Sequence, residues 1–472
     1  MAADACAPPW AGSCYHGGLF NSMDELEQAI TLRKLYKAAK KTCAGSMWKD
    51  GTALYRWDAL ENSVKLRNVF RAKKYKLQRY LRFKITRPKP RGITATRVRD
   101  RHVQRSICDN ILYDRITRSF VANNGACQRE RGVDYELNRL KAGLHRYYMR
   151  QRQKRANEMG CRVEDVGPFE VEGWVYKGDV SKYFPSTPQR NAKEIIRKHT
   201  RSEELRALLC AVVESFSEEW FTAQAIEAGA SEKAAQICAR KICEARTELE
   251  MLPLRSAFAR YAIMRECSLQ ISRAVDELTG ISPEAREVLR IKAHSDDARG
   301  IALGSQVSQL LQLAQLDDAD HYATEVAHVG QHYRYMDDYL LIDEEREKVE
   351  KAAAGMREIL ESKNLSENPK SQIIPLRKGF IFLKWHIYLT PTGKVIMQAA
   401  PGVAKDEKRR LRRMVRKMRE GTATRASIEA HYQGWRAHME RGKTERLLKK
   451  MDNYLARLLD GEERKEDHHE HL

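Results

Sequence analysis

Residues 332–342 constrain the fold more than any other stretch of this sequence. They read His-Tyr-Arg-Tyr-Met-Asp-Asp-Tyr-Leu-Leu-Ile, two arms rich in aromatic and branched residues around a pair of carboxylates. Such residues favour strands, so the pattern predicts a β-hairpin with Asp337 and Asp338 at its tip. Two adjacent carboxylates repel each other, and a cation beside them relieves the repulsion. Oxygen ligands suit a hard ion such as Mg²⁺.

A pair of aspartates in a turn also has a simpler explanation, because Asp side chains bond to nearby backbone amides. A second carboxylate with a matching context shifts the balance. Residues 175–186 read as a strand that runs into a turn, and Asp179 lies near the end of that strand. Carboxylates on separate strands can hold two ions beside reacting phosphate oxygens, so the pattern is typical of phosphoryl transfer.

Length and charge set wider limits. The chain has 472 residues, a formal net charge of +21 and an isoelectric point near 9.5. This length allows two or three domains, and the charge favours a polyanionic partner, with nucleic acid the first candidate. The ten cysteines show no Cys-x-x-Cys spacing, which argues against a zinc ribbon and fits a reducing cytoplasm. No apolar run is long enough for a membrane span, so we expect no membrane partner.

Several short motifs occur in an order that resembles the prokaryotic reverse transcriptases. Residues 178–186 are similar to the first catalytic motif of that family, and residues 335–338 match its Tyr-x-Asp-Asp motif. The segment 299–309 looks like the one between them. Asn368-Pro-Lys370 and residues 379–383 look like the later palm lysine and the primer grip. The resemblance covers most of the chain, from about residue 97 to about residue 451.

The resemblance implies an RNA-directed DNA polymerase that uses two Mg²⁺ ions, with Mn²⁺ as a substitute. Asp179 and Asp337 would ligate both ions, with Val180 as a further ligand, and Asp338 would shape the field and bind one ion transiently. Phe184 would exclude a 2′-hydroxyl and so select dNTPs. The other residues expected at the nucleotide are Arg129, Arg131, Gly304, Gln309 and Lys370, the last as proton donor to pyrophosphate. Plain structural readings stay open for them: a core Phe, solvated arginines in a loop and a surface lysine.

The sequence departs from many relatives at two places. It has Ala302-Leu303-Gly304 where they carry Pro-Gln-Gly, and Ser308-Gln309 where they carry Ser-Pro. This pattern is similar to the enzymes of diversity-generating retroelements and to some phage-defence reverse transcriptases of the abortive-infection type. Replacing an amide by Leu303 removes hydrogen-bonding capacity beside the template.

Two basic stretches are candidates for contact with nucleic acid. Residues 65–91 interleave cations with aromatics, which indicates either an amphipathic helix with a solvated face or a surface that tracks a phosphate backbone. Residues 405–419 form a predicted cationic helix, followed by helices at 429–440 and 444–459, as in the thumb of the family. Its predicted core is Trp435, Leu447, Met451 and Leu455. The predicted contacts are Arg71, Lys73, Lys74, Lys76, Arg79, Lys405, Arg409, Arg412 and Arg416.

We therefore expect an α+β fold of the right-hand polymerase type, with fingers, an antiparallel palm sheet and a three-helix thumb. The predicted divisions are 1–95 for a basic helical extension, 96–217 for fingers and first part of the palm, 218–297 for a helical insertion, 298–399 for the palm, 400–462 for the thumb and 463–472 for a disordered tail. The insertion is either one or two packed helices or a docking surface for RNA or another protomer.

The leading functional prediction is a cytoplasmic reverse transcriptase that makes cDNA from an associated structured noncoding RNA, in antiphage defence. Diversity generation, untemplated or protein-primed DNA synthesis, and a non-catalytic RNA-binding scaffold are the alternatives. The intact set of Asp179, Asp337 and Asp338 disfavours the scaffold. A homo-oligomer is a further expectation.

Overall fold

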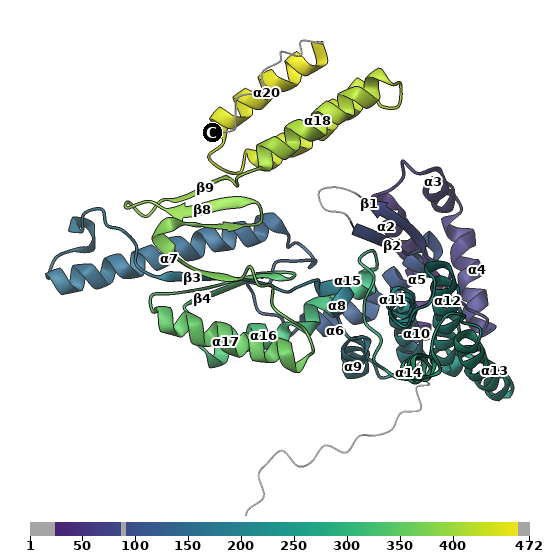
Figure 1. Ribbon diagram of the computed structural model, residues 1–472. Coiled ribbons are helices and arrows are strands. Elements are labelled where there is room, and N and C mark those ends of the chain that lie inside the picture. Colours follow the sequence, from purple (N-terminus) through teal and green to yellow (C-terminus); the bar gives the residue numbers. More distant parts are fainter. Residues whose placement is uncertain (1–23, 86–90, 461–472) are drawn as a thin grey trace, which may run out of the picture.

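The computed structural model describes residues 24–85 and 91–460 (Figure 1). The first 23 residues of the predicted N-terminal extension and the predicted tail at 463–472 lie outside these residues. The fold is α+β, as predicted, and every strand pair is antiparallel. Within the described ranges the strands form a two-stranded, a four-stranded and a three-stranded sheet.

The four-stranded sheet has the order β4-β5-β3-β6. Its strands are β3 (Trp174–Asp179), β4 (Gln331–Tyr335), β5 (Asp338–Asp343) and β6 (Gln372–Pro375). The predicted hairpin is confirmed, because β4 pairs with β5 across a two-residue turn at 336–337. The predicted strand that ends at Asp179 is confirmed as well.

Helices cover both faces of this sheet, and the alternating side chains of β5 show which helix covers which face. Leu340 and Ile342 pack on the side of α7 (Val133–Met159), with Leu140 and Leu144. Tyr339 and Leu341 pack on the other side, against α17 (Arg346–Ser362). Since successive strand residues point to opposite faces, Asp338 shares the α7 face with Leu340. The register carries Asp179 to that same face.

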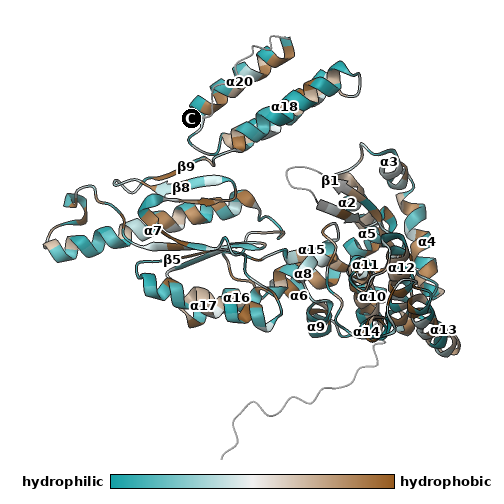
Figure 2. Ribbon diagram, viewed as in Figure 1, coloured by the Kyte–Doolittle hydropathy of each residue, from teal (hydrophilic) through white to brown (hydrophobic). Residues whose placement is uncertain are grey.

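The third sheet leads into three C-terminal helices. The strands are β7 (Phe380–Phe382), β8 (Trp385–Leu389) and β9 (Val395–Ala399). The helices are α18 (Val403–Arg419), α19 (Arg425–Met439) and α20 (Glu445–Asp460), close to the predicted bounds. As predicted, Met451 and Leu455 are buried in the core of this bundle, and Trp435 and Leu447 pack against it. Figure 2 shows α18 as mostly hydrophilic along its length.

The N-terminal part differs from the prediction. The basic helical extension begins with two helices, α1 (Glu25–Ala29) and α2 (Leu32–Ala44), because Thr31 between them has an extended ψ of 147°. The amphipathic helix considered for residues 65–91 is wrong beyond Arg71. Helix α4 (Ala59–Arg71) ends at Arg71, and β1 (Leu81–Ile85) pairs with β2 (Arg91–Ala95). Helix α3 (Asp50–Trp57) precedes α4.

The insertion forms four α-helices among the described residues, where one or two were expected. They are α11 (Glu218–Glu227), α12 (Glu232–Glu250), α13 (Ala257–Asp276) and α14 (Pro283–His294). They share a core of their own, which includes Phe221, Ile242, Ile271 and Leu289. Small residues such as Ala235 and Ala239 allow α12 to pack closely against its neighbours.

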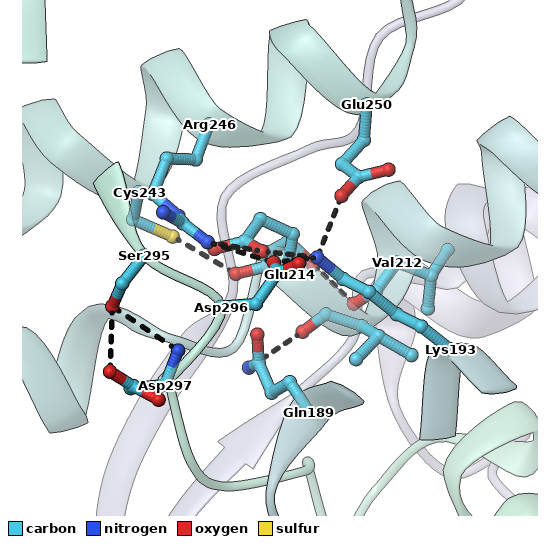
Figure 3. Close-up of polar contacts among 12 residues, drawn as sticks. Gln189, Lys193, Val212, Glu214, Cys243, Arg246, Glu250, Ser295, Asp296 and Asp297 are labelled. Carbon is cyan, nitrogen blue, oxygen red and sulfur yellow. Dashed lines mark hydrogen bonds and ion pairs between the residues drawn. The ribbon is translucent and has the colours of Figure 1, made fainter. Parts of the chain in front are cut away.

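Buried ion pairs join this insertion to α9 (Gln189–His199) and α10 (Glu203–Glu214), as Figure 3 shows. The Lys193 ammonium lies 3.0 Å from Glu214 and 2.7 Å from Glu250. The Arg246 guanidinium binds the same Glu214 carboxylate at 2.6 Å. Two cations thus neutralise a fully buried carboxylate, and burying that charge without them would be costly.

Five further α-helices and five short helical turns complete the described part of the chain. No helix among the described residues has the length and apolar character to cross a lipid bilayer. Every cysteine in those ranges is a free thiol. The helices are α5 (Val98–Ile107), α6 (Tyr113–Thr117), α8 (Tyr183–Ser186), α15 (Gln306–Gln315) and α16 (Asp317–His321), with π-helical turns at Cys108–Leu112 and Tyr322–Val326 and 3₁₀ turns at Val163–Asp165, Leu252–Leu254 and Leu376–Lys378.

Candidate active site

Three carboxylates distant in sequence meet at one end of the four-stranded sheet. Asp179 ends β3 and is the direct cross-strand partner of Asp338, the first residue of β5. Asp337 lies in the turn before it, next to Met336, whose φ of 59° is left-handed. Burial raises the pKa of Tyr183, and the negative charge of Asp337 adds to that rise, so this turn also lies close to the segment after β3. The predicted convergence is therefore present in the backbone pairing.

A loop after α17 holds Asp179 in place. The Asn368 side chain donates a 2.7 Å hydrogen bond to Asp179 Oδ2, and its backbone N–H donates to the Asp179 carbonyl. The Asp179 N–H donates to Ser371 Oγ at 3.3 Å. Lys370 is exposed in this loop, where its backbone N–H bonds to Asn368 Oδ1. Sequence reasoning named the Asn-Pro-Lys motif but missed Asn368 as the residue that orients a site carboxylate.

Gly178 allows an aromatic ring to cover the strand next to the site. It faces Tyr339 across the β3–β5 pair, and a Cβ atom at this glycine would lie 2.1 Å from the Tyr339 ring. The Tyr339 hydroxyl in turn donates to Glu367, in the loop that also carries Asn368. Gly178 thus leaves space for the Tyr339 ring on the face of the sheet opposite Asp179 and Asp338.

A buried arginine fixes the turn between β4 and β5. Arg334 Nη1 donates to the Met336 carbonyl at 3.1 Å, and Nη2 donates to the Leu313 carbonyl on α15 at 3.0 Å. Its guanidinium also pairs with Asp320 at 2.6 Å, and both side chains are fully buried. Burial opposes the charge on Arg334, but the Asp320 carboxylate outweighs it and raises the arginine pKa.

The segment 299–304 lies directly beside the first catalytic motif. The Ile301 N–H donates to the Phe184 carbonyl at 3.0 Å, and the Gly300 N–H donates to Thr187 at 2.9 Å. Phe184 is half-buried and packs against the small cluster that contains Val180 and Tyr183. Gly304 is exposed and lies against β2, where a Cβ would come within 3.3 Å of the Thr94 carbonyl. Gln309 is half-buried on α15.

The two arginines expected at the triphosphate bind groups of this chain in the structure. Arg129 pairs with Asp114 at 3.0 Å and lies over the Tyr113 ring. Arg131 donates to the Asn124 carbonyl at 3.1 Å and lies over Tyr135. Their loop borders the turn between β4 and β5, since Cys127 Sγ is 3.8 Å from Met336 Sδ. A triphosphate would have to compete with these contacts.

The predicted nucleic-acid contacts fall into two groups of exposed cations. Lys405, Arg409, Arg412 and Arg416 follow one face of α18, opposite the buried Leu411 and Val415. The second group is also exposed, and within it Lys73 and Arg79 form ion pairs with Glu204 and Glu244. Its members are Arg71, Lys73, Lys74, Lys76 and Arg79. Among the aromatics of this stretch, Phe70 and Tyr75 are buried and stack on each other, whereas Phe83 is exposed.

A buried carboxyl lies beneath the loop that borders the turn. The Gly125 N–H donates to the Arg334 carbonyl, and the absent side chain of Gly125 leaves room for Glu136. Glu136 is fully buried, and neither of its carboxyl oxygens has a hydrogen-bond partner among the described residues. Burial is the main cause that raises the pKa of Glu136, to about 8.

The donor chemistry of the site fits Mg²⁺. Asp179, Asp337 and Asp338 offer only oxygen ligands, which hard divalent ions prefer. The described residues contain no group of three or more His, Cys, Asp or Glu side chains already arranged to hold a metal ion. The backbone brings the carboxylates to one place, and an ion bound by Asp179 would compete with the hydrogen bond from Asn368.

Comparisons with known proteins give little beyond this geometry. No family model matches the chain, and no curated protein matches it. Among solved structures, it is similar to a telomerase from Candida albicans determined with a fragment of telomeric RNA, at 11% identity and a TM-score of 0.36. The match covers 86% of this chain and 60% of the telomerase chain. A TM-score at this level does not establish a shared fold.

Glu136 gives the stability of this region a pH dependence. With a pKa of about 8 when folded and 4.5 in a model compound, its carboxyl stays protonated in the folded chain while the unfolded chain ionises. Unfolding then releases a proton between these pKa values, so this group lowers the free energy of unfolding by about 1.4 kcal/mol per pH unit as pH rises. Glu136→Gln should therefore gain stability relative to the wild type from pH 5 to pH 8.

Urea denaturation of both proteins at pH 5, 6.5 and 8 measures this difference. Glu158→Gln, an exposed position on the same helix α7, is the matched control and should show no such trend. A constant difference between Glu136→Gln and the wild type across the three pH values would contradict the burial argument.

Proposed function

We propose that this chain is an RNA-directed DNA polymerase that extends a primer by two-metal nucleotidyl transfer. The observation that carries the proposal is the pairing of Asp179 with Asp338 in register, with Asp337 in the adjoining turn. Three carboxylates on neighbouring strand ends are a suitable donor set for ions that stabilise a transferring phosphoryl group. The order of the motifs along the chain supports the same reaction.

In this mechanism Asp179 and Asp337 would hold the ions, with Val180 as a further ligand, and Asp338 would add negative charge beside them. Bound Mg²⁺ would lower the pKa of the primer 3′-hydroxyl and neutralise the triphosphate and the leaving pyrophosphate. The strand ladder, the hydrogen bond that Asn368 donates to the Asp179 carboxylate and the one that the Asp179 N–H donates to Ser371 fix Asp179 before substrate arrives. Preorganised groups need little rearrangement in the transition state, which is how such sites gain rate.

Other residues serve the substrates. Phe184 contacts the sugar of the incoming nucleotide and disfavours a 2′-hydroxyl, and the exposed Lys370 donates a proton to pyrophosphate. The segment 299–309, with Gly304 and Gln309, lies next to Phe184 and borders the template. The cationic face of α18 follows the phosphate backbone of the duplex, so its contacts are independent of sequence.

We further propose that the template is a structured noncoding RNA and that the cDNA acts in antiphage defence. This part of the proposal depends on the motif resemblance, and above all on the Leu303-Gly304 and Ser308-Gln309 departures. Diversity generation is the alternative that the same departures favour.

Removing one carboxylate should abolish synthesis. Asp179→Asn and Asp337→Asn should each lower dNTP incorporation on an RNA template with a DNA primer by at least about 100-fold, because charge stabilisation at the transferring phosphate is lost. Incorporation of labelled dNTPs with Mg²⁺, and separately with Mn²⁺, measures the effect. Asp318→Asn, at an exposed carboxylate outside the sheet, should retain activity. Full activity in Asp179→Asn would overturn the proposed mechanism.

Phe184 should determine the selectivity for dNTPs over rNTPs. Phe184→Ala removes the ring that would meet a 2′-hydroxyl, so the ratio of kcat/KM for rNTPs to that for dNTPs should rise. Because Phe184 also packs against Val180 and Tyr183, the variant is expected to lose some stability, but a ratio within one variant cancels such a loss. An unchanged ratio, with activity retained, would leave Phe184 as a core residue only.

A further inference from the structure

Two tryptophans near the two ends of α3 are largely exposed. Trp48 precedes α3 and is 79% exposed, and Trp57 ends the same helix and is 89% exposed. Leu54 and Leu60 are exposed beside them. Large apolar side chains gathered on one surface are unusual in a soluble protein and mark a binding site.

The exposure of these side chains does not result from a missing hydrophobic core. The helices α2 and α4 bury Leu35, Leu66 and Phe70 in the large N-terminal cluster, and α3 buries Thr52. Tyr55 on α3 also reaches inward, where its hydroxyl contacts His102 Nδ1 at 3.0 Å. The helices are therefore held by their inner faces, while the indoles project from the outer one.

The N-terminal segment that carries the indoles is cationic as a whole. Residues 31–72 contain ten Lys and Arg against three Asp and Glu. The Lys49 ammonium lies 4.9 Å from the Trp48 ring centre, and Lys40 lies 4.4 Å from that of Tyr36. A hollow of about 480 Å³ opens nearby, with Lys65 and Arg97 in its lining. Cations that follow a phosphate backbone, combined with exposed aromatic faces, are the means by which proteins bind single strands.

A second exposed apolar surface differs in charge and serves as a contrast. On α13, Phe258 is 98% exposed and Tyr261 is also exposed. This helix carries three Arg against one Glu and one Asp, so its charge is close to balanced. An apolar face without a cationic surround does not favour a polyanion, whereas the Trp48–Trp57 surface does.

We propose that the Trp48–Trp57 surface binds single-stranded nucleic acid, with unpaired bases stacked on the two indoles. Figure 1 shows α3 and α4 at the right edge of the molecule, whereas β3 and β4 lie left of its centre, so this surface lies away from the strands that carry the carboxylates. It would hold an unpaired part of the RNA partner while the templating part lies elsewhere. The proposal deepens the proposed function by adding a second RNA contact, but binding here does not require polymerase activity.

Fluorescence anisotropy with a labelled oligouridine of about 20 nucleotides tests the proposal in the full-length chain. Trp57→Ala and Trp48→Ala should each raise the Kd by roughly five- to hundredfold, the range found when a base loses its aromatic partner. Trp57→Phe retains a stacking face and should stay within about threefold of the wild type. The matched control Phe258→Ala removes an equally exposed ring and should leave the Kd unchanged.

Two further measurements separate this surface from the polymerase site. Asp337→Asn should bind the oligouridine as the wild type does, whether or not the chain is a polymerase. The slope of log Kd against log salt should stay the same in Trp57→Ala, because the phosphate contacts remain. Unchanged affinity in the Trp48→Ala/Trp57→Ala double variant would overturn the proposal and leave the surface to a protein partner or a second copy of the chain.

Discussion

The buried ion pair between Arg334 and Asp320 is the contact on which the candidate site depends most. Arg334 is part of β4, yet its guanidinium binds a carboxylate on α16, a carbonyl on α15 and the carbonyl of Met336 in the turn. The Arg334 side chain thus attaches the turn that contains Asp337 to helices α15 and α16. A buried pair of this kind is costly to break, since either partner alone would be an uncompensated charge.

The same contact links the turn to the rest of the site. Helix α15 begins just after Gly304, and the segment before it pairs with the backbone of Phe184. The Phe184 segment follows β3, which is paired in register with β5. A closed set of backbone contacts therefore relates the two acidic motifs to each other and to the segment expected to face the template. A site built this way needs little rearrangement when substrate binds.

The local elements of the site could be predicted from sequence because their signals are local. Alternating aromatic and branched residues gave the hairpin at 332–342, and the helical periods gave the three C-terminal helices. The break at Thr31 has no comparable signal. Residues 81–85 do alternate as a strand, but their cations also fit an amphipathic helix, and pairing with β2 decided between the two.

Contacts between distant segments could not be predicted. The Asn368 side chain donates a hydrogen bond to Asp179, which lies 189 residues earlier in the chain. The Glu136 side chain packs against Gly125, in a loop whose conformation depends on the rest of the fold. Nothing local distinguished the exposed Trp57 from an aromatic core residue such as Tyr75. Arg129 and Arg131 were assigned from their position in a motif, whereas the structure places Arg129 against Asp114 of α6 and Arg131 against the Asn124 carbonyl of its own loop. Their role at a triphosphate stays a prediction.

The central claim is that three segments, at 177–181, 335–339 and 366–371, surround one divalent-ion site. Iron-directed cleavage tests it most directly: Fe²⁺ replaces Mg²⁺, and ascorbate with peroxide then generates hydroxyl radicals that cut the backbone beside the bound ion. The account predicts cuts in all three segments of the wild type, suppressed by excess Mg²⁺ and lost together in Asp179→Asn. Cleavage of one segment alone, or a pattern that Asp179→Asn leaves unchanged, would contradict it.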